Sequence, residues 1–282
     1  MVTLPQFYVD DLIKRAITED INYIDVTSDY LLDDSNTSTA VFVAKDDGVL
    51  AGIDIALRVF KLIDSELTYS VFKKDGDEIK KGDTIATVCG KTKSILKAER
   101  TSLNLLQHMS GIATMTRKCV ELVKGTNASI VETRKTLPGL RPIQKYSVIV
   151  GGGKNHRYNL SDAAMLKDNH IDAYKSLTNA VSALREKAGH MVKIEVEVDS
   201  FDRLREALDV EADIIMLDNM TPAQMAEAVK IADGKALLEA SGNITLDNIA
   251  EVAKTGVDII SLGALTHSVK AFDISLKIKT NG

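Results

Sequence analysis

The chain has 282 residues, of which 45% are apolar and 27% charged, and a formal charge of −5. This length suits one α/β barrel or two domains with a sizeable core. We expect no nucleic-acid-binding protein, because the chain is mildly acidic and contains no tryptophan for base stacking.

We expect a cytoplasmic protein that does not bind membranes, since no apolar run is long enough to span a bilayer and no charged-then-apolar leader opens the sequence. The two cysteines, Cys89 and Cys119, lie far apart in the sequence and outside any C-x-x-C or Cys/His cluster. This spacing argues against a disulfide framework and against structural zinc. It indicates that both cysteines fill the core.

The first third of the chain predicts an α+β domain. Apolar positions at helical spacing predict a helix over residues 7–20. Short strands are predicted at residues 40–43, 48–51 and 69–72. A helix is predicted at residues 53–63, between the second and third of these strands. In segment 74–88 two Gly-Asp turns flank alternating apolar residues, which predicts hairpin strands. A lipoyl-like carrier has a similar rhythm, but no lysine stands in a tight Asp-Lys-Ala turn here.

A long helix is predicted over residues 92–124, where apolar residues recur every three or four positions. Gly111 within it marks either a break or close packing. Arg100 lies early in this helix, next to Glu99. Spacing alone favours a solvated surface charge for Arg100.

The second half alternates short apolar runs with helical stretches. The predicted strands are residues 129–133, 163–166, 193–198, 213–217, 236–239 and 257–262. The predicted helices include residues 176–188, 201–208, 222–232 and 246–255. Such alternation predicts parallel strands joined by crossover helices.

Polar residues follow these strands at their C-terminal ends, where a TIM-like barrel keeps its active site. They include Arg134, Lys135, Lys167, Glu197, Asp218, Ser241, Gly242, Asn243 and Gly263. The last four follow the last two strands and precede helices, so backbone N–H groups and a positive helix end could hold one phosphate. His267 lies one turn further and could add a donor. A plain Ser-Gly-Asn turn is the alternative.

Glu197 and Asp218 form an acidic pair within apolar strands. An ionised carboxylate is costly in such a strand unless it meets a cation or a metal. The alternative is a buried salt bridge to Lys135 or Lys167. Glu195 lies two residues before Glu197 and points to the same side of its strand, so the pattern alone does not separate their roles.

Residues 131–171 concentrate positive charge in an acidic chain. They contain Arg134, Lys135, Arg141, Lys145, His156, Arg157, Lys167 and His170. A local excess of this kind indicates a small anionic ligand rather than nucleic acid. Arginine forks bind carboxylates through two hydrogen bonds at once, so several arginines suit a ligand with two carboxylates.

The same stretch contains E-T-R-K-T-L-P-G-L-R, G-G-G-K-N-H-R and L-K-D-N-H-I, and E-R-T-S-L-N-L-L-Q-H-M-S-G-I-A-T precedes it. The motifs E-V-E-V-D, I-M-L-D-N, E-A-S-G-N and S-L-G-A-L-T-H-S follow in order. Over nearly the whole chain this set resembles the quinolinate phosphoribosyltransferases, also called nicotinate-nucleotide pyrophosphorylases (carboxylating). Asn159 departs from the usual Gly, and we expect it at a left-handed position that Asn tolerates. Gln144 stands where an acidic residue is common, which leaves Lys145 without one possible local partner.

The resemblance implies an incomplete TIM-like α/β barrel with an α+β N-terminal domain, which suits six predicted strands. We expect residues 1–110 to form the N-terminal domain and residues 111–269 the catalytic barrel. The tail, residues 270–282, is expected to pack with the N-terminal domain.

The resemblance also implies a reaction: phosphoribosyl diphosphate and quinolinate give nicotinate mononucleotide, diphosphate and CO2 in de novo NAD biosynthesis. It assigns catalysis to Lys135, Lys167, Glu197 and Asp218. It assigns substrate binding to Arg100, Arg134, His156, Arg157, Ser241, Gly242, Asn243, Gly263 and His267. Glu197 and Asp218 are expected to hold Mg²⁺, to contact the ribose hydroxyls, or both.

The resemblance reverses the surface reading of Arg100, which in the family reaches a substrate carboxylate in the neighbouring subunit. It therefore implies a homodimer whose active sites are shared between subunits. Two alternatives stay open. One is a paralogue with another acceptor, such as the quinolinate phosphoribosyltransferase-like protein associated with molybdenum transport, although the full Arg/His set counts against it. The other is a binding protein that keeps the pocket without turnover.

Overall fold

The computed structural model describes residues 4–280. Contacts divide the chain into two compact units. The first unit comprises residues up to 117, residues 137–152 and residues from 268 onward, and the second unit comprises residues 118–136 and 153–267. The expected boundary after residue 110 therefore lies inside one long helix, and residues 137–152 return to the first unit.

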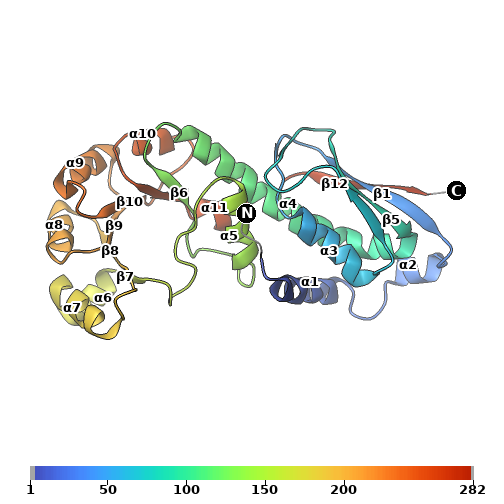
Figure 1. The fold of residues 1–282 in the computed structure, drawn as a ribbon, viewed down its shortest axis with the longest axis horizontal. Coiled ribbons are helices and arrows are strands. Elements are labelled where there is room, and N and C mark those ends of the chain that lie inside the picture. Colours follow the sequence, from blue (N-terminus) through green and yellow to red (C-terminus); the bar gives the residue numbers. More distant parts are fainter. Residues whose placement is uncertain (1–3, 281–282) are drawn as a thin grey trace. The chain divides into compact units, whose positions relative to one another are not determined.

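The first unit is built on a four-stranded antiparallel sheet in the order β12-β1-β5-β3 (Figure 1). β1 (Thr37–Ala44) and β5 (Thr84–Lys91) are central, and β3 (Thr68–Val71) forms one edge. The other edge is β12 (Ile274–Thr280), which pairs with β1 along the whole of its own length. A segment that follows the second unit in the chain thus completes this sheet.

The predicted hairpin over residues 74–88 is wrong. β4 (Glu78–Ile79) pairs with β2 (Gly48–Val49), whereas β5 pairs with β1 and β3. The Asp47 carboxylate accepts the N–H of Lys81 at 2.8 Å, which ties the turn after β4 to the segment that precedes β2. The two strands therefore enter different sheets.

The helices with residues in the first unit are α1 (Gln6–Asp20), α2 (Val26–Leu31), α3 (Ile53–Ile63), α4 (Thr92–Leu122) and α5 (Arg141–Val150). α1, α3 and α4 confirm the predicted helices, whereas α2 and α5 were not predicted. Helices and sheet share one apolar core, in which the rings of Phe42 and Phe60 meet edge to face with centroids 5.9 Å apart. The Asp75 carboxylate accepts the N–H groups of Gly52 and Ile53 and so fixes the start of α3.

Gly111 marks close packing rather than a break in α4. The helix runs uninterrupted to Leu122, and a Cβ atom at Gly111 would lie 2.2 Å from the carbonyl oxygen of Lys270. α4 has 31 residues, yet neither it nor any other helix within residues 4–280 is long and apolar enough to cross a membrane.

The second unit contains a six-stranded parallel sheet in the order β6-β11-β10-β9-β8-β7. Its strands are β6 (Ser129–Val131), β7 (Ala164–Leu166), β8 (Ile194–Val198), β9 (Ile214–Asp218), β10 (Leu237–Ser241) and β11 (Ile259–Ser261). β6 and β7 end the order, so the barrel is not closed among the described strands. The predicted incomplete TIM-like α/β barrel with an α+β N-terminal domain is confirmed.

Helices separate most of these strands. The helices after β7 are α6 (Asp168–Tyr174), α7 (Leu177–Lys187), α8 (Phe201–Asp209), α9 (Pro222–Ala232), α10 (Ile249–Ala253) and α11 (Ala264–His267). Of these, α8 and α9 lie outside the curved sheet (Figure 1). Ser176, Ser200 and Thr221 cap α7, α8 and α9, because each side-chain oxygen accepts a backbone N–H from the first turn. α8 and α9 begin a few residues after β8 and β9 end, and α6 begins directly after β7, so the loops at the C-terminal edge of the sheet are short.

Candidate active site

A cavity of about 530 Å³ opens among these loops in the second unit. Its lining consists of Thr133, Arg134, Lys135, His156, Arg157, Met165, Lys167, Glu197, Met216, Asp218, Asn219, Ser241, Gly242 and Asn243. Most of the residues predicted to form a site therefore share one cavity. A further cavity of about 410 Å³ lies in the first unit, but its Arg58 is already held by both carboxylate oxygens of Asp10.

The cationic stretch 131–171 is divided between the units. Arg141 and Lys145 lie on α5 in the first unit, and Lys145 is fully buried there. His170 lies on α6, where its Nδ1 accepts the N–H of Lys167 at 3.1 Å. Fewer cationic side chains therefore line the cavity than the sequence of residues 131–171 suggested.

The guanidinium group of Arg157 is fixed by contacts with neighbouring residues. Its guanidinium donates to the carbonyl of Ala163 at 2.8 Å and contacts the sulfur of Met165 at 3.5 Å, while its buried Nε has no hydrogen-bond partner among the described residues. Burial and the charge of nearby Arg134 both lower the pKa of Arg157. Two neighbouring cations with this mutual repulsion favour a bound anion.

Lys167 and Glu197 form an ion pair at the cavity. The sequence left open a buried salt bridge to Lys135 or Lys167; the pair with Lys167 is present, but it is not buried, since the Lys167 side chain is 48% exposed. Asp218, at the end of the adjacent strand, is half-buried, and burial together with the charge of Glu197 raises its pKa. Its Oδ2 accepts a hydrogen bond from the Asn219 side chain at 2.8 Å.

The Ser241-Gly242-Asn243 loop has a tight left-handed backbone. Gly242 has φ 88° and Asn243 has φ 52°, and a Cβ atom at Gly242 would lie 2.3 Å from Oδ1 of Asn219. Asn243 donates to that same oxygen at 3.0 Å. Asn219 thus joins the loop to Asp218, and only glycine fits at position 242 without a clash.

Three predicted site residues lie outside the cavity lining. Gly263 lies beside both His267 and Lys135, because a Cβ atom at Gly263 would lie 3.0 Å from the His267 ring and 3.1 Å from Cδ of Lys135. Arg100 belongs to the first unit, where it is an exposed residue of α4. The prediction that Asn159 is left-handed is wrong, because its φ is not positive; its Oδ1 instead accepts the N–H of Ser161 at 2.7 Å.

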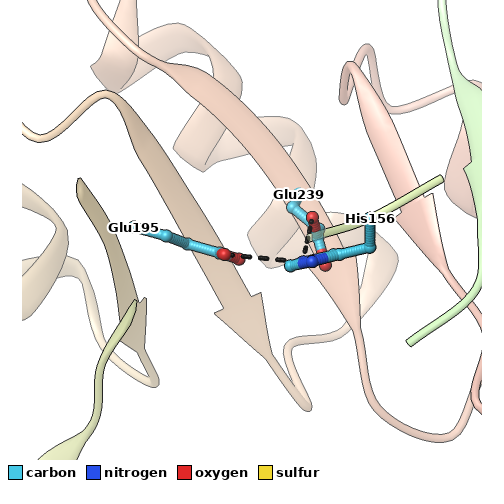
Figure 2. A group of neighbouring side chains, drawn as sticks. All are labelled: His156, Glu195 and Glu239. Carbon is cyan, nitrogen blue, oxygen red and sulfur yellow. Dashed lines mark ion pairs between the residues drawn. The ribbon is translucent and has the colours of Figure 1, made fainter. Parts of the chain in front are cut away.

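His156 faces two buried glutamates (Figure 2). Its Nε2 lies 3.4 Å from a carboxylate oxygen of Glu195 on β8 and 3.4 Å from one of Glu239 on β10. Burial alone would lower the pKa of His156, but hydrogen bonds to the two glutamates outweigh it and raise that pKa. Burial raises the pKa of Glu195. Glu195 and Glu197 therefore differ: the former meets His156, the latter the cavity.

The sequence assigned no role to Glu239, nor to Asn219, which it placed only among the polar residues at the strand ends. Glu239 carried a signal, since it is a charged residue inside the apolar run of β10, two positions before Ser241. Asn219 carried a weaker one, because an Asn directly after a strand is common in turns.

Comparison with known proteins gives a consistent result over the whole chain. The family models "Quinolinate phosphoribosyl transferase, N-terminal domain" and "C-terminal domain" match residues 25–110 and 112–277. A probable nicotinate-nucleotide pyrophosphorylase [carboxylating] of Bacillus subtilis is 44% identical over 95% of this chain and 92% of its own. The nicotinate-nucleotide pyrophosphorylase [carboxylating] of Mycobacterium leprae is 44% identical over 95% of this chain and 96% of its own.

Solved structures agree with these relatives. The crystal structure of NadC from Streptococcus pyogenes superimposes with a TM-score of 0.96 at 41% identity, covering 100% of both chains. The nicotinate-nucleotide pyrophosphorylase from Francisella tularensis gives a TM-score of 0.94 at 39% identity, covering 98% of both chains. The chain therefore belongs to the quinolinate phosphoribosyltransferase family.

Proposed function

We propose that the chain is a cytoplasmic enzyme that transfers the phosphoribosyl group of phosphoribosyl diphosphate to quinolinate with loss of CO2. The products are nicotinate mononucleotide and diphosphate, and the step serves de novo NAD biosynthesis. The observation that carries the proposal is one cavity in which paired arginines, two lysines, two carboxylates and a glycine loop converge.

The arginines suit quinolinate. Arg134 lies close enough to Arg157 to lower the pKa of Arg157, and a ligand with adjacent carboxylates would relieve that repulsion. Nicotinate lacks the C2 carboxylate and would leave a cation unpaired. We therefore expect a much lower kcat/KM for nicotinate than for quinolinate.

The other side suits phosphoribosyl diphosphate. The Ser241-Gly242-Asn243 loop would receive the 5-phosphate, with Gly263 and His267 beside it. Glu197 and Asp218 would face the ribose, while Lys135 and Lys167 would face the diphosphate. Lys167 would exchange part of its contact with Glu197 for the phosphate oxygens.

The residues present fit Mg²⁺, which binds through one or two carboxylates together with substrate phosphates. Glu197 and Asp218 supply two carboxylates, and the repulsion between them, which adds to burial in raising the pKa of Asp218, would be relieved by a divalent cation. When bound, the ion would neutralise diphosphate charge. Asp218→Asn should raise the Mg²⁺ concentration for half-maximal rate; an unchanged dependence at wild-type rate would favour a purely structural carboxylate.

The chemistry requires no nucleophilic side chain. The C1–O bond breaks with its electron pair leaving on diphosphate, which Lys135 and Lys167 stabilise while Glu197 and Asp218 face the positive charge that develops on the ribose. The pyridine nitrogen then forms a bond to C1. The quaternised ring accepts the electrons of the C2–carboxylate bond as CO2 departs, and a proton from water replaces it at C2.

A homodimer with shared active sites would bring Arg100 of one chain to the quinolinate of the other. Suppose Arg100→Ala and Arg157→Ala each abolish activity. Refolding equal amounts together gives half mixed dimers, each with one intact site, so activity should return to about a quarter of wild type. If Arg100 acts within its own chain, no intact site can form in a mixed dimer. A mixture without activity, in which mixed dimers are shown to be present, would therefore refute the shared site.

The deciding experiment combines the purified protein with phosphoribosyl diphosphate, Mg²⁺ and quinolinate, and measures nicotinate mononucleotide and CO2. Stoichiometric appearance of both products is expected, with little turnover when nicotinate replaces quinolinate. Equal kcat/KM for the two acceptors would sink the assignment. Tight quinolinate binding without product would indicate a binding protein.

A further inference from the structure

The glutamates beside His156 have no place in the reaction above. Glu195 and Glu239 are 2% and 1% exposed, and each keeps one buried oxygen, Oε1, without a hydrogen-bond partner among the described residues. Buried carboxylates in this state destabilise a fold unless a partner compensates them. The compensation visible in Figure 2 is the Nε2 of His156, which both carboxylates share.

The other ring nitrogen of His156 is also engaged. The backbone N–H of Arg157 points at Nδ1 over 2.7 Å. Nδ1 accepts this bond only with its lone pair free, since two N–H groups cannot face each other at that distance. The ring proton is therefore on Nε2, between the glutamates. The glutamates raise the pKa of His156 and so favour a second ring proton, but that proton would have to lie on Nδ1, where it would face the Arg157 N–H. Both ring nitrogens thus face protein groups.

We propose that Glu195 and Glu239 are positioning residues, which hold the His156 imidazole so that its Nδ1 fixes the backbone of Arg157. Arg157 is then fixed at both ends, because its guanidinium also donates to the Ala163 carbonyl. His156 thereby serves the anion indirectly, through Arg157. The identity of the anion as quinolinate rests on the proposed function. The hydrogen bonds from the glutamates through His156 to Arg157 do not depend on it.

A metal ion is the competing occupant of this cluster. The three side chains each offer a donor atom within 4.8 Å of the others. A metal at Nε2, however, would displace the ring proton to Nδ1, where the Arg157 N–H already points. The geometry thus favours a shared proton over a metal.

The first test is direct. Nitrogen-15 NMR of the histidine-labelled wild type, with His156 assigned by His156→Gln, should give the neutral Nε2–H tautomer without any substrate. A Nδ1–H tautomer, or one equivalent of bound metal by elemental analysis, would overturn the proposal. This readout needs no turnover, so it stands or falls independently of the proposed reaction.

The second test compares Glu239→Leu, which removes the acceptor at similar volume, with Glu239→Gln, which keeps a carbonyl acceptor. Loss of one hydrogen bond should raise the KM for quinolinate about tenfold in the Leu variant, and Gln should restore most of it. The KM for phosphoribosyl diphosphate should stay within about twofold in both variants, because Arg157 does not serve that substrate.

Asp258→Ala is the matched control. It removes a carboxylate that accepts the N–H of Leu238, next to Glu239 on β10, without touching His156. It should leave both KM values unchanged. Equal losses in the Leu, Gln and control variants would mean that β10 was merely weakened. A fall in kcat alone would assign Glu239 to the chemistry instead, and either result would overturn the positioning role.

Discussion

The two ends of the six-stranded sheet use the same residue types for opposite purposes. At the N-terminal end, Asp213 accepts the N–H of Ile194 and Asp258 accepts the N–H of Leu238, each at 2.8 Å and each from the neighbouring strand. At the C-terminal end, the carboxylates of Glu197 and Asp218 face a cavity and repel each other. The acids at the N-terminal end are bound by backbone N–H groups, whereas those at the C-terminal end contact the side chains of Lys167 and Asn219 at the wall of the cavity.

This difference teaches that an acidic residue in an apolar strand is interpreted by its position along the strand. In a barrel the C-terminal edge carries the chemistry and the opposite edge carries stability. Variants at the C-terminal end should therefore change activity, and variants at the N-terminal end should change the free energy of unfolding.

The largest effect is expected for Lys167→Ala at the cavity. Removing a preorganised cation from developing diphosphate charge should lower kcat about 100- to 1000-fold. The side chain is 48% exposed, so the melting temperature should barely move. Steady-state kinetics and differential scanning fluorimetry measure both; a wild-type kcat would remove Lys167 from the catalytic set.

Arg157→Lys should have the next largest effect. It keeps the charge but loses the planar fork, so the KM for quinolinate should rise about 10- to 100-fold, the cost of one charge-assisted hydrogen bond. The KM for phosphoribosyl diphosphate should change little. Quinolinate kinetics identical to wild type would show that Arg157 is no carboxylate clamp.

Gly242→Ala should weaken binding of phosphoribosyl diphosphate. Its Cβ would clash with Asn219 at a left-handed position, so we expect the KM for that substrate to rise about tenfold, for a strain of roughly 1–2 kcal/mol. Gly189→Ala is the control, since a Cβ atom there meets nothing within 4 Å. Matching KM values in both variants would place the phosphate elsewhere.

Asp258→Ala should leave the kinetics of the folded enzyme intact and lower stability. Loss of its bond to Leu238 should cost about 1–2 kcal/mol, measured by urea denaturation. A changed kcat or KM would break the separation between the two ends.

The rhythm of the second unit could be predicted from sequence because short apolar strands and capped helices are encoded locally. The predicted helix 222–232 coincides with α9, and the polar residues fall at the strand ends as expected. Contacts between distant strands could not be predicted. The meeting of Glu195, Glu239 and His156, and the pairing of β4 with β2, depend on which neighbour the fold supplies. The local periodicity of the sequence does not determine which strands become neighbours.

The place of β12 also bears on how the protein is made. On a ribosome, β1 emerges early, but its partner β12 follows only after the entire second unit has been synthesised. Until then one edge of β1 offers unpaired backbone groups to any extended chain nearby. The second unit, whose strands are contiguous apart from residues 137–152, can fold first. A nascent chain halted before β12 should therefore be a better chaperone client than the complete chain.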